Sequence, residues 1–106
     1  MSDVPVLVVN KVRAITATVA RHYGLTPTEV VSGGRSTPLS EARQVAWHLV
    51  RLHTRTRSNS AIGRAFSRDP TTVDVGLRRI AARIEAEPAL RARVNAIASE
   101  LSWRQP

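Results

Sequence analysis

The sequence predicts an all-α fold, a compact domain of five to six helices. Apolar residues recur at spacings of three and four along most of the chain, and proline and glycine separate these periodic segments. The one strand-like run, 6-VLVV-9, merges into a helical pattern. Hydrophobic residues make up 42% of the 106 residues, enough to form a core in a chain of this size. We therefore expect a single domain over residues 1–106.

The first two predicted helices lie on either side of Gly24. The first spans about residues 8–23, and Gly24 ends it. Its apolar face consists of Val8, Val12, Ile15, Val19 and Tyr23. A short second helix begins with Thr26 as its N-cap, because Pro27 suits the first helical position and Glu29 completes a capping box.

A loop and a long helix follow. The loop 32-SGGRSTP-38 carries one exposed cation, Arg35. Thr37 opens a third helix over about residues 38–53. The residues that share its apolar stripe are Ala42, Val45, Ala46, Leu49, Val50 and His53. Trp47 lies off this stripe, and we expect it to be a partly buried packing residue.

Three more helices complete the predicted fold. The fourth is 61-AIGRAF-66, which either Ser58 or Ser60 caps. The fifth begins at Pro70 and ends near residue 86, and the last spans about residues 88–101. Their apolar stripes are Val73, Leu77, Ile80 and Ile84 in the fifth helix and Leu90, Val94, Ile97 and Leu101 in the last.

Charge is concentrated in the middle of the chain. The net charge is +8, and residues 35–83 alone contain ten arginines and three acidic residues, a net +7. This distribution indicates a surface that faces a polyanion, although the preference for arginine also fits a GC-rich genome. Arg55 and Arg57, in the basic loop 54-TRTRSNS-60, are candidates for phosphate contact, with a solvated turn as the alternative.

The segment 66-FSRDPTTVDVGLRRI-80 predicts a helix-turn-helix over about residues 61–86. Asp69 is a good N-cap, and a short helix, a tight turn and a longer helix with a polar start form the motif. In such motifs the first turns of the second helix enter the major groove of DNA. The side of this helix turned away from the core carries Thr71, Val75, Arg78, Arg79 and Ala82. Val75 suits contact with a thymine methyl, although a lone exposed valine is also common.

Several classes of function find no support in the sequence. There is no cysteine, which excludes disulfides and thiolate metal sites and fits a reducing cytoplasm. No apolar run approaches the roughly 18 residues of a membrane span, and the start of the chain does not read as a signal peptide. His22, His48 and His53 lack metal-ligand spacing, and no catalytic constellation or glycine-rich phosphate loop is present. We therefore expect no enzymatic activity, metal, nucleotide cofactor or membrane contact.

The segment 68-RDPTTVDVGLRRI-80 resembles the signature of the C-terminal DNA-binding domain, domain IV, of the bacterial replication initiator DnaA. The segment 19-VARHYGLTPTEVVSGGRSTPLSEARQVAWHLVR-51 is similar to the upstream part of that domain, and 60-SAIGRAF-66 to its Ile-Gly-x-x-Phe helix. The likeness covers about residues 12–101. It implies a helical fold like that of the Trp repressor.

The resemblance also implies roles for individual residues. Arg35 matches the family's loop arginine that enters the minor groove. The positions that match its other base- and phosphate-contacting residues are Arg43, Gln44, Asp69, Thr71, Thr72 and Arg79. Arg68, at the start of the signature, and Arg78 complete the predicted DNA-binding set together with Val75 and the loop arginines 55 and 57.

Three features depart from the family pattern. Pro70 replaces the signature's histidine, and Val75-Gly76 stand where the family commonly has His-Ala. The turn 67-SRD-69 is one residue shorter than the family's Gly-Gly-Arg-Asp. These departures weigh against the family's A·T-rich recognition box and leave its docking mode intact.

The expected function is sequence-specific binding of double-stranded DNA by a stand-alone domain that regulates transcription or replication. The initiator's ATPase module is absent from the sequence, so we expect no ATP-driven melting of an origin. The expected location is the cytoplasm of a bacterial or phage-infected cell, in association with the nucleoid. The alternative is a protein-interaction adaptor on the same scaffold, for example a modulator of the initiator. Pro70, Val75-Gly76 and Trp103 favour this alternative.

Overall fold

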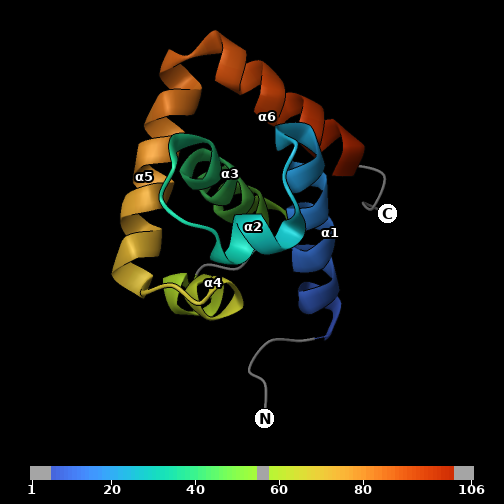
Figure 1. Cartoon of the computed structure of the whole chain (residues 1–106), viewed down its shortest axis with the longest axis vertical. Coiled ribbons are helices and arrows are strands. Elements are labelled where there is room, and N and C mark those ends of the chain that lie inside the picture. Colours follow the sequence, from blue (N-terminus) through green and yellow to red (C-terminus); the bar gives the residue numbers. More distant parts are fainter. Residues whose placement is uncertain (1–5, 55–57, 102–106) are drawn as a thin grey trace.

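The third helix forms the centre of the fold. The computed structural model describes residues 6–54 and 58–101, and these residues form six helices and no strand. The helices are α1 (Val6–Tyr23), α2 (Pro27–Ser32), α3 (Thr37–Thr54), α4 (Asn59–Phe66), α5 (Pro70–Ala86) and α6 (Pro88–Leu101). In Figure 1, α3 runs through the middle of the molecule, with α1 on one side and α5 on the other. The predicted all-α fold is confirmed.

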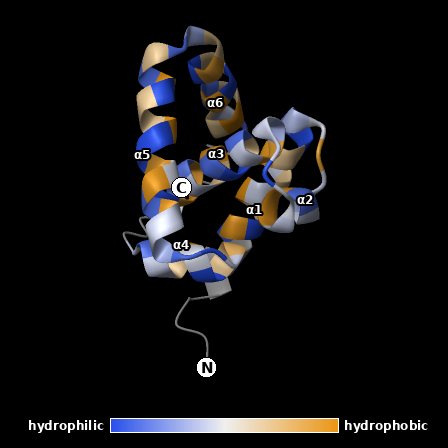
Figure 2. Ribbon diagram, turned by 60° about the vertical axis from the view of Figure 1, so that its left-hand side comes forward, coloured by the Kyte–Doolittle hydropathy of each residue, from blue (hydrophilic) through white to orange (hydrophobic). Residues whose placement is uncertain are grey.

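Most positions of the predicted apolar stripes are buried in the core, which also includes residues outside these stripes, such as Ile62 and Phe66. In α3, the buried apolar residues include Ala42, Val45, Ala46, Leu49 and Val50. Figure 2 shows hydrophobic and hydrophilic residues alternating around α5, as expected of a helix with one buried side. The stripe of α5 is buried at Val73, Leu77 and Ile80, and that of α6 at all four predicted positions. Because α6 packs against both α5 and α1, it closes the end of the core.

Trp47 is more deeply buried than the sequence predicts. Its side chain lies off the apolar stripe of α3 but is only 3% exposed. The ring of Phe66 meets it edge-on, with centroids 6.2 Å apart and planes inclined by 84°. α4 and α5 both pack against α3 and therefore cover a side of α3 that α1 leaves open. Trp47 is therefore buried by this second layer of packing, which the apolar pattern of a single helix does not reveal.

Helix starts agree with the predicted caps. The Thr26 hydroxyl accepts the Glu29 N–H over 3.1 Å, and the Glu29 carboxylate accepts the Thr26 N–H over 2.8 Å. This is the predicted capping box. Of the two serines considered for α4, Ser58 is the cap, and its hydroxyl accepts the Ala61 N–H. α4 consequently begins at Asn59, two residues earlier than predicted.

Ion pairs join the helices around one end of the core. The Tyr23 hydroxyl donates to Glu41 over 2.6 Å, and Glu41 pairs with Arg83 over 2.8 Å. Arg83 also pairs with Glu87 over 2.7 Å, and Arg93 lies over the Tyr23 ring. This network connects α1, α3, α5 and α6.

Over residues 6–54 and 58–101, no helix has both the length and the apolar character of a membrane span.

Candidate nucleic-acid interface

α4, a three-residue turn and α5 form the predicted helix-turn-helix. Ser67 ends α4 in the left-handed backbone region, with φ of 52°. The Arg68 N–H donates to the Gly63 carbonyl over 2.8 Å and closes the turn. A Cβ at Gly63 would lie 2.3 Å from the Arg68 carbonyl oxygen, so only glycine permits this approach. A tight turn of this kind fixes the angle between the two helices.

The first turn of α5 is polar and exposed. The Asp69 carboxylate accepts the Thr71 N–H over 2.8 Å, which confirms Asp69 as the N-cap. Pro70, Thr71 and Thr72 are exposed around it, whereas Val73 is fully buried. The start of α5 therefore projects polar groups away from the core, while the Asp69 cap accepts the Thr71 N–H.

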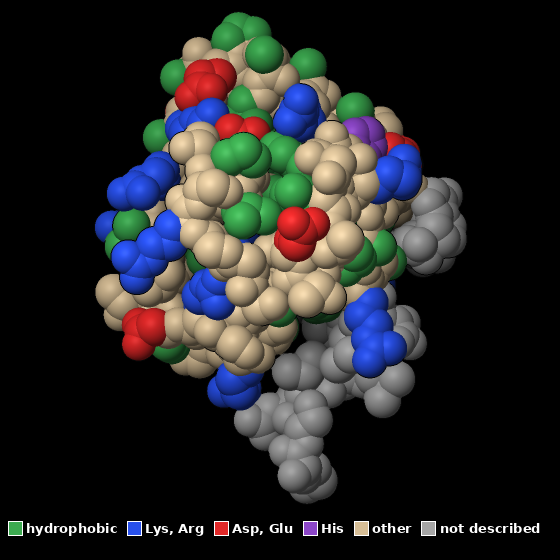
Figure 3. All heavy atoms as spheres, viewed as in Figure 1, with side chains coloured by type: hydrophobic (Ala, Val, Ile, Leu, Met, Phe, Trp, Pro, Cys, Tyr) green, Lys and Arg blue, Asp and Glu red, His purple; other side chains and the backbone are tan. Residues whose placement is uncertain are grey.

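The outer side of α5 is open along its length. Of the residues predicted to face away from the core, Val75 is 46% exposed, and Thr71, Arg78, Arg79 and Ala82 are also exposed. In Figure 3, basic side chains gather along the left-hand edge of the molecule, where α5 lies in Figure 1. A recognition helix needs this side to be free of other parts of the chain, and the described residues leave it free.

A hollow of about 650 Å³ lies beside α5, between its first turns, the start of α3 and the loop that precedes α3. Among the residues that the structure describes, four arginines and no carboxylate line it. The lining includes eight of the predicted DNA-binding residues, namely Arg35, Arg43, Gln44, Arg68, Thr71, Thr72, Val75 and Arg79. Asp69 and Arg78 are outside the hollow but close to it along α5. Arg55 and Arg57 are outside the described residues. The fold therefore gathers positive charge from segments far apart in the sequence.

Arg35 and Arg79 provide exposed charge at this hollow. Both side chains are exposed, and neither forms an ion pair or hydrogen bond within the described part of the chain. Arg78 differs, because it pairs with Asp74 over 3.2 Å one turn earlier on α5. Its positive charge is therefore partly compensated in the free protein.

Arg43 is not the open surface residue that its predicted phosphate contact suggests. It is only 5% exposed and donates hydrogen bonds to the carbonyls of Val30, Gly33 and Gly34 over 2.9, 2.7 and 3.3 Å. Burial lowers the pKa of Arg43, and the nearby charge of Arg68 lowers it further. The guanidinium of Arg43 is thus bound to backbone carbonyls at the edge of the hollow.

A series of polar contacts, which the sequence analysis missed, connects α3, α4 and α5. Asn59 accepts a hydrogen bond from Arg51 of α3 and donates to Asp74 of α5 over 3.4 Å. Asp74 in turn pairs with Arg78. The sequence indicates only one of these contacts, through the i,i+4 spacing of Asp74 and Arg78.

No three His, Asp or Glu side chains converge to hold a metal within residues 6–54 and 58–101.

Comparison with known proteins points to one family. A family model described as the bacterial DnaA protein helix-turn-helix matches residues 12–80. The chromosomal replication initiator protein DnaA of Deinococcus radiodurans is 34% identical over 87 residues, which cover 82% of this chain and 18% of that protein.

Two further relatives carry the same description. The DnaA protein of Mesorhizobium japonicum is 41% identical over 71 residues, covering 66% of this chain and 14% of the relative. That of Oenococcus oeni is 36% identical over 88 residues, covering 82% and 19%. The chain thus spans less than a fifth of the length of these relatives. A helix-turn-helix of this family supports binding to DNA and is itself a binding motif without catalytic groups.

Proposed function

Because the chain belongs to the family of DnaA C-terminal helix-turn-helix domains, we propose that it binds double-stranded DNA at preferred sequences and thereby regulates transcription or replication. The observation that carries the proposal is the arginine-lined hollow beside the open side of α5. Residues of α5 and the exposed loop arginine Arg35 line the same hollow, and this arrangement supports contact with two adjacent grooves.

In the proposed complex, the first turns of α5 lie in the major groove. The hydroxyls of Thr71 and Thr72 contact phosphates or base edges at its entrance, and Val75 contacts a thymine methyl. Arg35 enters the adjacent minor groove, where its planar guanidinium meets base edges and a strong negative potential. Arg79 binds phosphate further along α5. These assignments are supported by the exposure of all five side chains.

The electrostatic part of binding comes from cations that are free before DNA arrives. Arg35 and Arg79 have no carboxylate partner among the described residues, so no ion pair must break when they meet phosphate. Each phosphate they neutralise releases condensed counterions, which makes affinity fall steeply with salt. Arg78 must exchange Asp74 for phosphate and contributes less.

The regulatory role rests on what the chain shares with its relatives. Those relatives are described as chromosomal replication initiators, and this chain matches only the part of them that contains the helix-turn-helix. We propose that it occupies sites on bacterial or phage DNA in the cytoplasm, where it recruits or excludes other factors. The adaptor alternative was based partly on the departure from the family pattern at Gly76. That argument is weaker now, because Gly76 has a packing role beside Trp47. Trp103, another motive, lies outside the described residues.

In vitro selection followed by titration tests the proposal. Duplexes selected from a random pool should bind about a thousandfold more tightly than unrelated duplexes at the same salt concentration. A plot of log affinity against log salt should be linear, with a slope of about 0.9 for each phosphate neutralised. Equal affinity for every duplex would refute sequence preference, and no binding at low ionic strength would refute DNA binding altogether.

A further inference from the structure

The carbonyl oxygen of Gly33 accepts hydrogen bonds from two arginines that are far apart in the sequence. Arg43 Nη2 donates to it over 2.7 Å, and Arg68 Nη2 over 3.2 Å. Gly33 belongs to the loop that carries Arg35, Arg43 to the first turns of α3, and Arg68 to the turn of the helix-turn-helix. A single backbone atom therefore joins the loop of Arg35 to the motif that presents α5.

Both arginines are also held by other carbonyls. Arg43 Nε donates to Val30 over 2.9 Å, while Arg68 Nη1 donates to Phe66 and Ser67 over 3.5 and 3.4 Å. Neither guanidinium has a carboxylate partner among the described residues. A planar fork with several donors reaches carbonyls of two segments at once, which the single ammonium of lysine does with poorer geometry.

Gly33 lets the loop lie close enough for this arrangement. A Cβ at this position would be 2.2 Å from the carbonyl oxygen of Glu29, a backbone atom of α2 that cannot move aside alone. A Cβ at the neighbouring Gly34 would meet nothing within 4 Å. The φ of Gly33 is −68°, so close approach and not backbone conformation requires the glycine.

We propose that Arg43 and Arg68 are positioning residues, which set the place of Arg35 relative to α5 by holding the Gly33 carbonyl. The inference rests on the proposed function, because it assigns these arginines a part in binding DNA through two grooves. A loop held in its bound position before DNA arrives saves the conformational entropy of ordering it on binding. Arg68 and Arg43 then act through Arg35, and their own contact with phosphate is not needed.

A double-mutant cycle separates positioning from direct contact. Arg68→Lys keeps the charge but loses the fork, and we expect it to weaken binding of the selected duplex about tenfold with an unchanged salt slope. In an Arg35→Ala background the same substitution should weaken binding less than about twofold, because the residue through which it acts is gone. An equal loss in both backgrounds would overturn the inference and identify a direct contact. Arg43→Lys should follow the same pattern as Arg68→Lys.

Two neighbouring glycines supply a test without any change of charge. Gly33→Ala should displace the loop and weaken binding about tenfold through Arg35, whereas Gly34→Ala should stay within about twofold of the wild type. If Arg68→Lys prevents folding, as judged by circular dichroism, this pair decides the question. Equal affinities of the two alanine variants would contradict the inference.

Hydrogen exchange gives a readout that does not depend on DNA. In Arg68→Lys, the Gly33 amide, which donates to the Glu29 carbonyl over 2.8 Å, should exchange faster than in the wild type, while the amides of α3 and α5 stay protected. Unchanged exchange in the loop would overturn the inference. A wild-type chain that binds no duplex would refute the proposed function, whereas a DNA-binding wild type with an additive cycle would refute only the positioning role.

Discussion

The indole of Trp47 lies directly against the backbone of Gly76. A Cβ at Gly76 would be 2.5 Å from Cζ3 of the indole and 2.9 Å from Cε3. Because Gly76 has no side chain, α5 packs closely against α3 at this point. Trp47 and Gly76 both line the hollow. It also gives a structural reason for a glycine where the family commonly has alanine: a bulky ring on α3 takes the space of the missing methyl group.

Gly76→Ala should therefore destabilise the domain. An added methyl in a tightly packed contact typically costs about 1–3 kcal/mol, although alanine alone would favour the helix. Urea unfolding measures the change, and Gly34→Ala, which meets open space, is the matched control. Trp47→Leu should make the alanine tolerable, so the double variant should be more stable than the sum of the single effects predicts. Strict additivity would show that the two residues are not coupled.

Ser67→Gly should stabilise the domain. Ser67 has φ of 52°, a left-handed conformation that costs a residue with a Cβ about 1 kcal/mol and glycine much less. Glycine's greater freedom in the unfolded chain offsets part of this gain, so we expect a net increase of about 0.5 kcal/mol in the free energy of unfolding. Ser60→Gly, in the helical backbone of α4, is the control and should show no increase. A loss of stability in Ser67→Gly would contradict the prediction.

The position of the helices was predictable because it depends on local signals. Apolar spacing, proline and capping residues such as Asp69 act within one or two turns, and the structure has every predicted helix. The burial of Trp47 and Arg43 was not predictable in this way, because it depends on which helices cover the remaining sides of α3. The bond from Arg68 to Gly33 connects residues 35 positions apart, and no periodic pattern reports such a contact.

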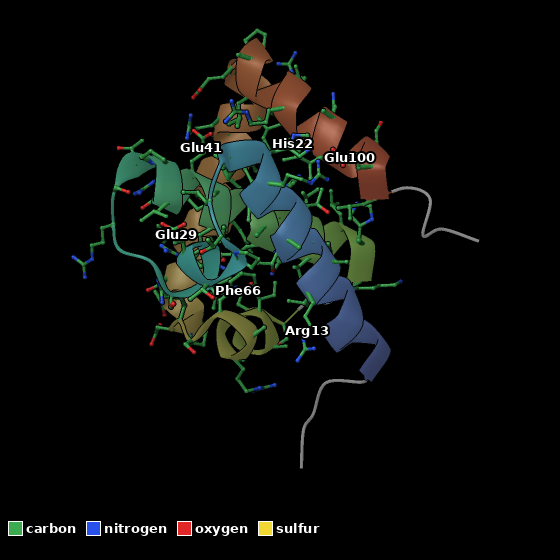
Figure 4. The ribbon with its side chains drawn as sticks, turned by 45° about the vertical axis from the view of Figure 1, so that its right-hand side comes forward. Arg13, His22, Glu29, Glu41, Phe66 and Glu100 are labelled. Atoms are coloured by element: carbon green, nitrogen blue, oxygen red, sulfur yellow. The ribbon has the colours of Figure 1, made fainter. Side chains whose placement is uncertain are left out.

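The stability of the domain should depend on pH through Glu100. Its carboxylate accepts hydrogen bonds from Arg21 and His22, and Figure 4 shows His22 and Glu100 meeting where α1 and α6 end. Arg21, and to a smaller extent His22, lowers the pKa of Glu100 in the folded state. The contribution is therefore fully present above the unfolded pKa of about 4.3 and is lost as pH falls through the folded pKa.

Urea unfolding at a series of pH values checks this dependence. Glu100→Gln should be less stable than the wild type near neutral pH, and the difference should vanish in acid, below the lowered pKa of Glu100. Glu85→Gln, an exposed glutamate of α5, is the control and should leave the pH profile of the wild type unchanged. A difference between wild type and Glu100→Gln that stays constant from neutral pH into acid would contradict the assignment.

Arg79→Ala should weaken binding to all duplexes alike. Arg79 is exposed at the edge of the hollow without a partner among the described residues, so its charge is available to phosphate. Loss of one phosphate contact should reduce the slope of log affinity against log salt by about 0.9 and leave the ratio between selected and unrelated duplexes unchanged.

Arg13→Ala provides the matched control for Arg79→Ala. Arg13 is also an exposed arginine without a partner among the described residues, but it lies on α1, on the opposite side of α3 from α5. The two variants have the same net charge, so a difference between them reports position and not overall charge. Titrations at several salt concentrations should give a reduced slope for Arg79→Ala and a wild-type slope for Arg13→Ala. Equal slopes would mean that DNA senses the net charge of the domain without docking at α5.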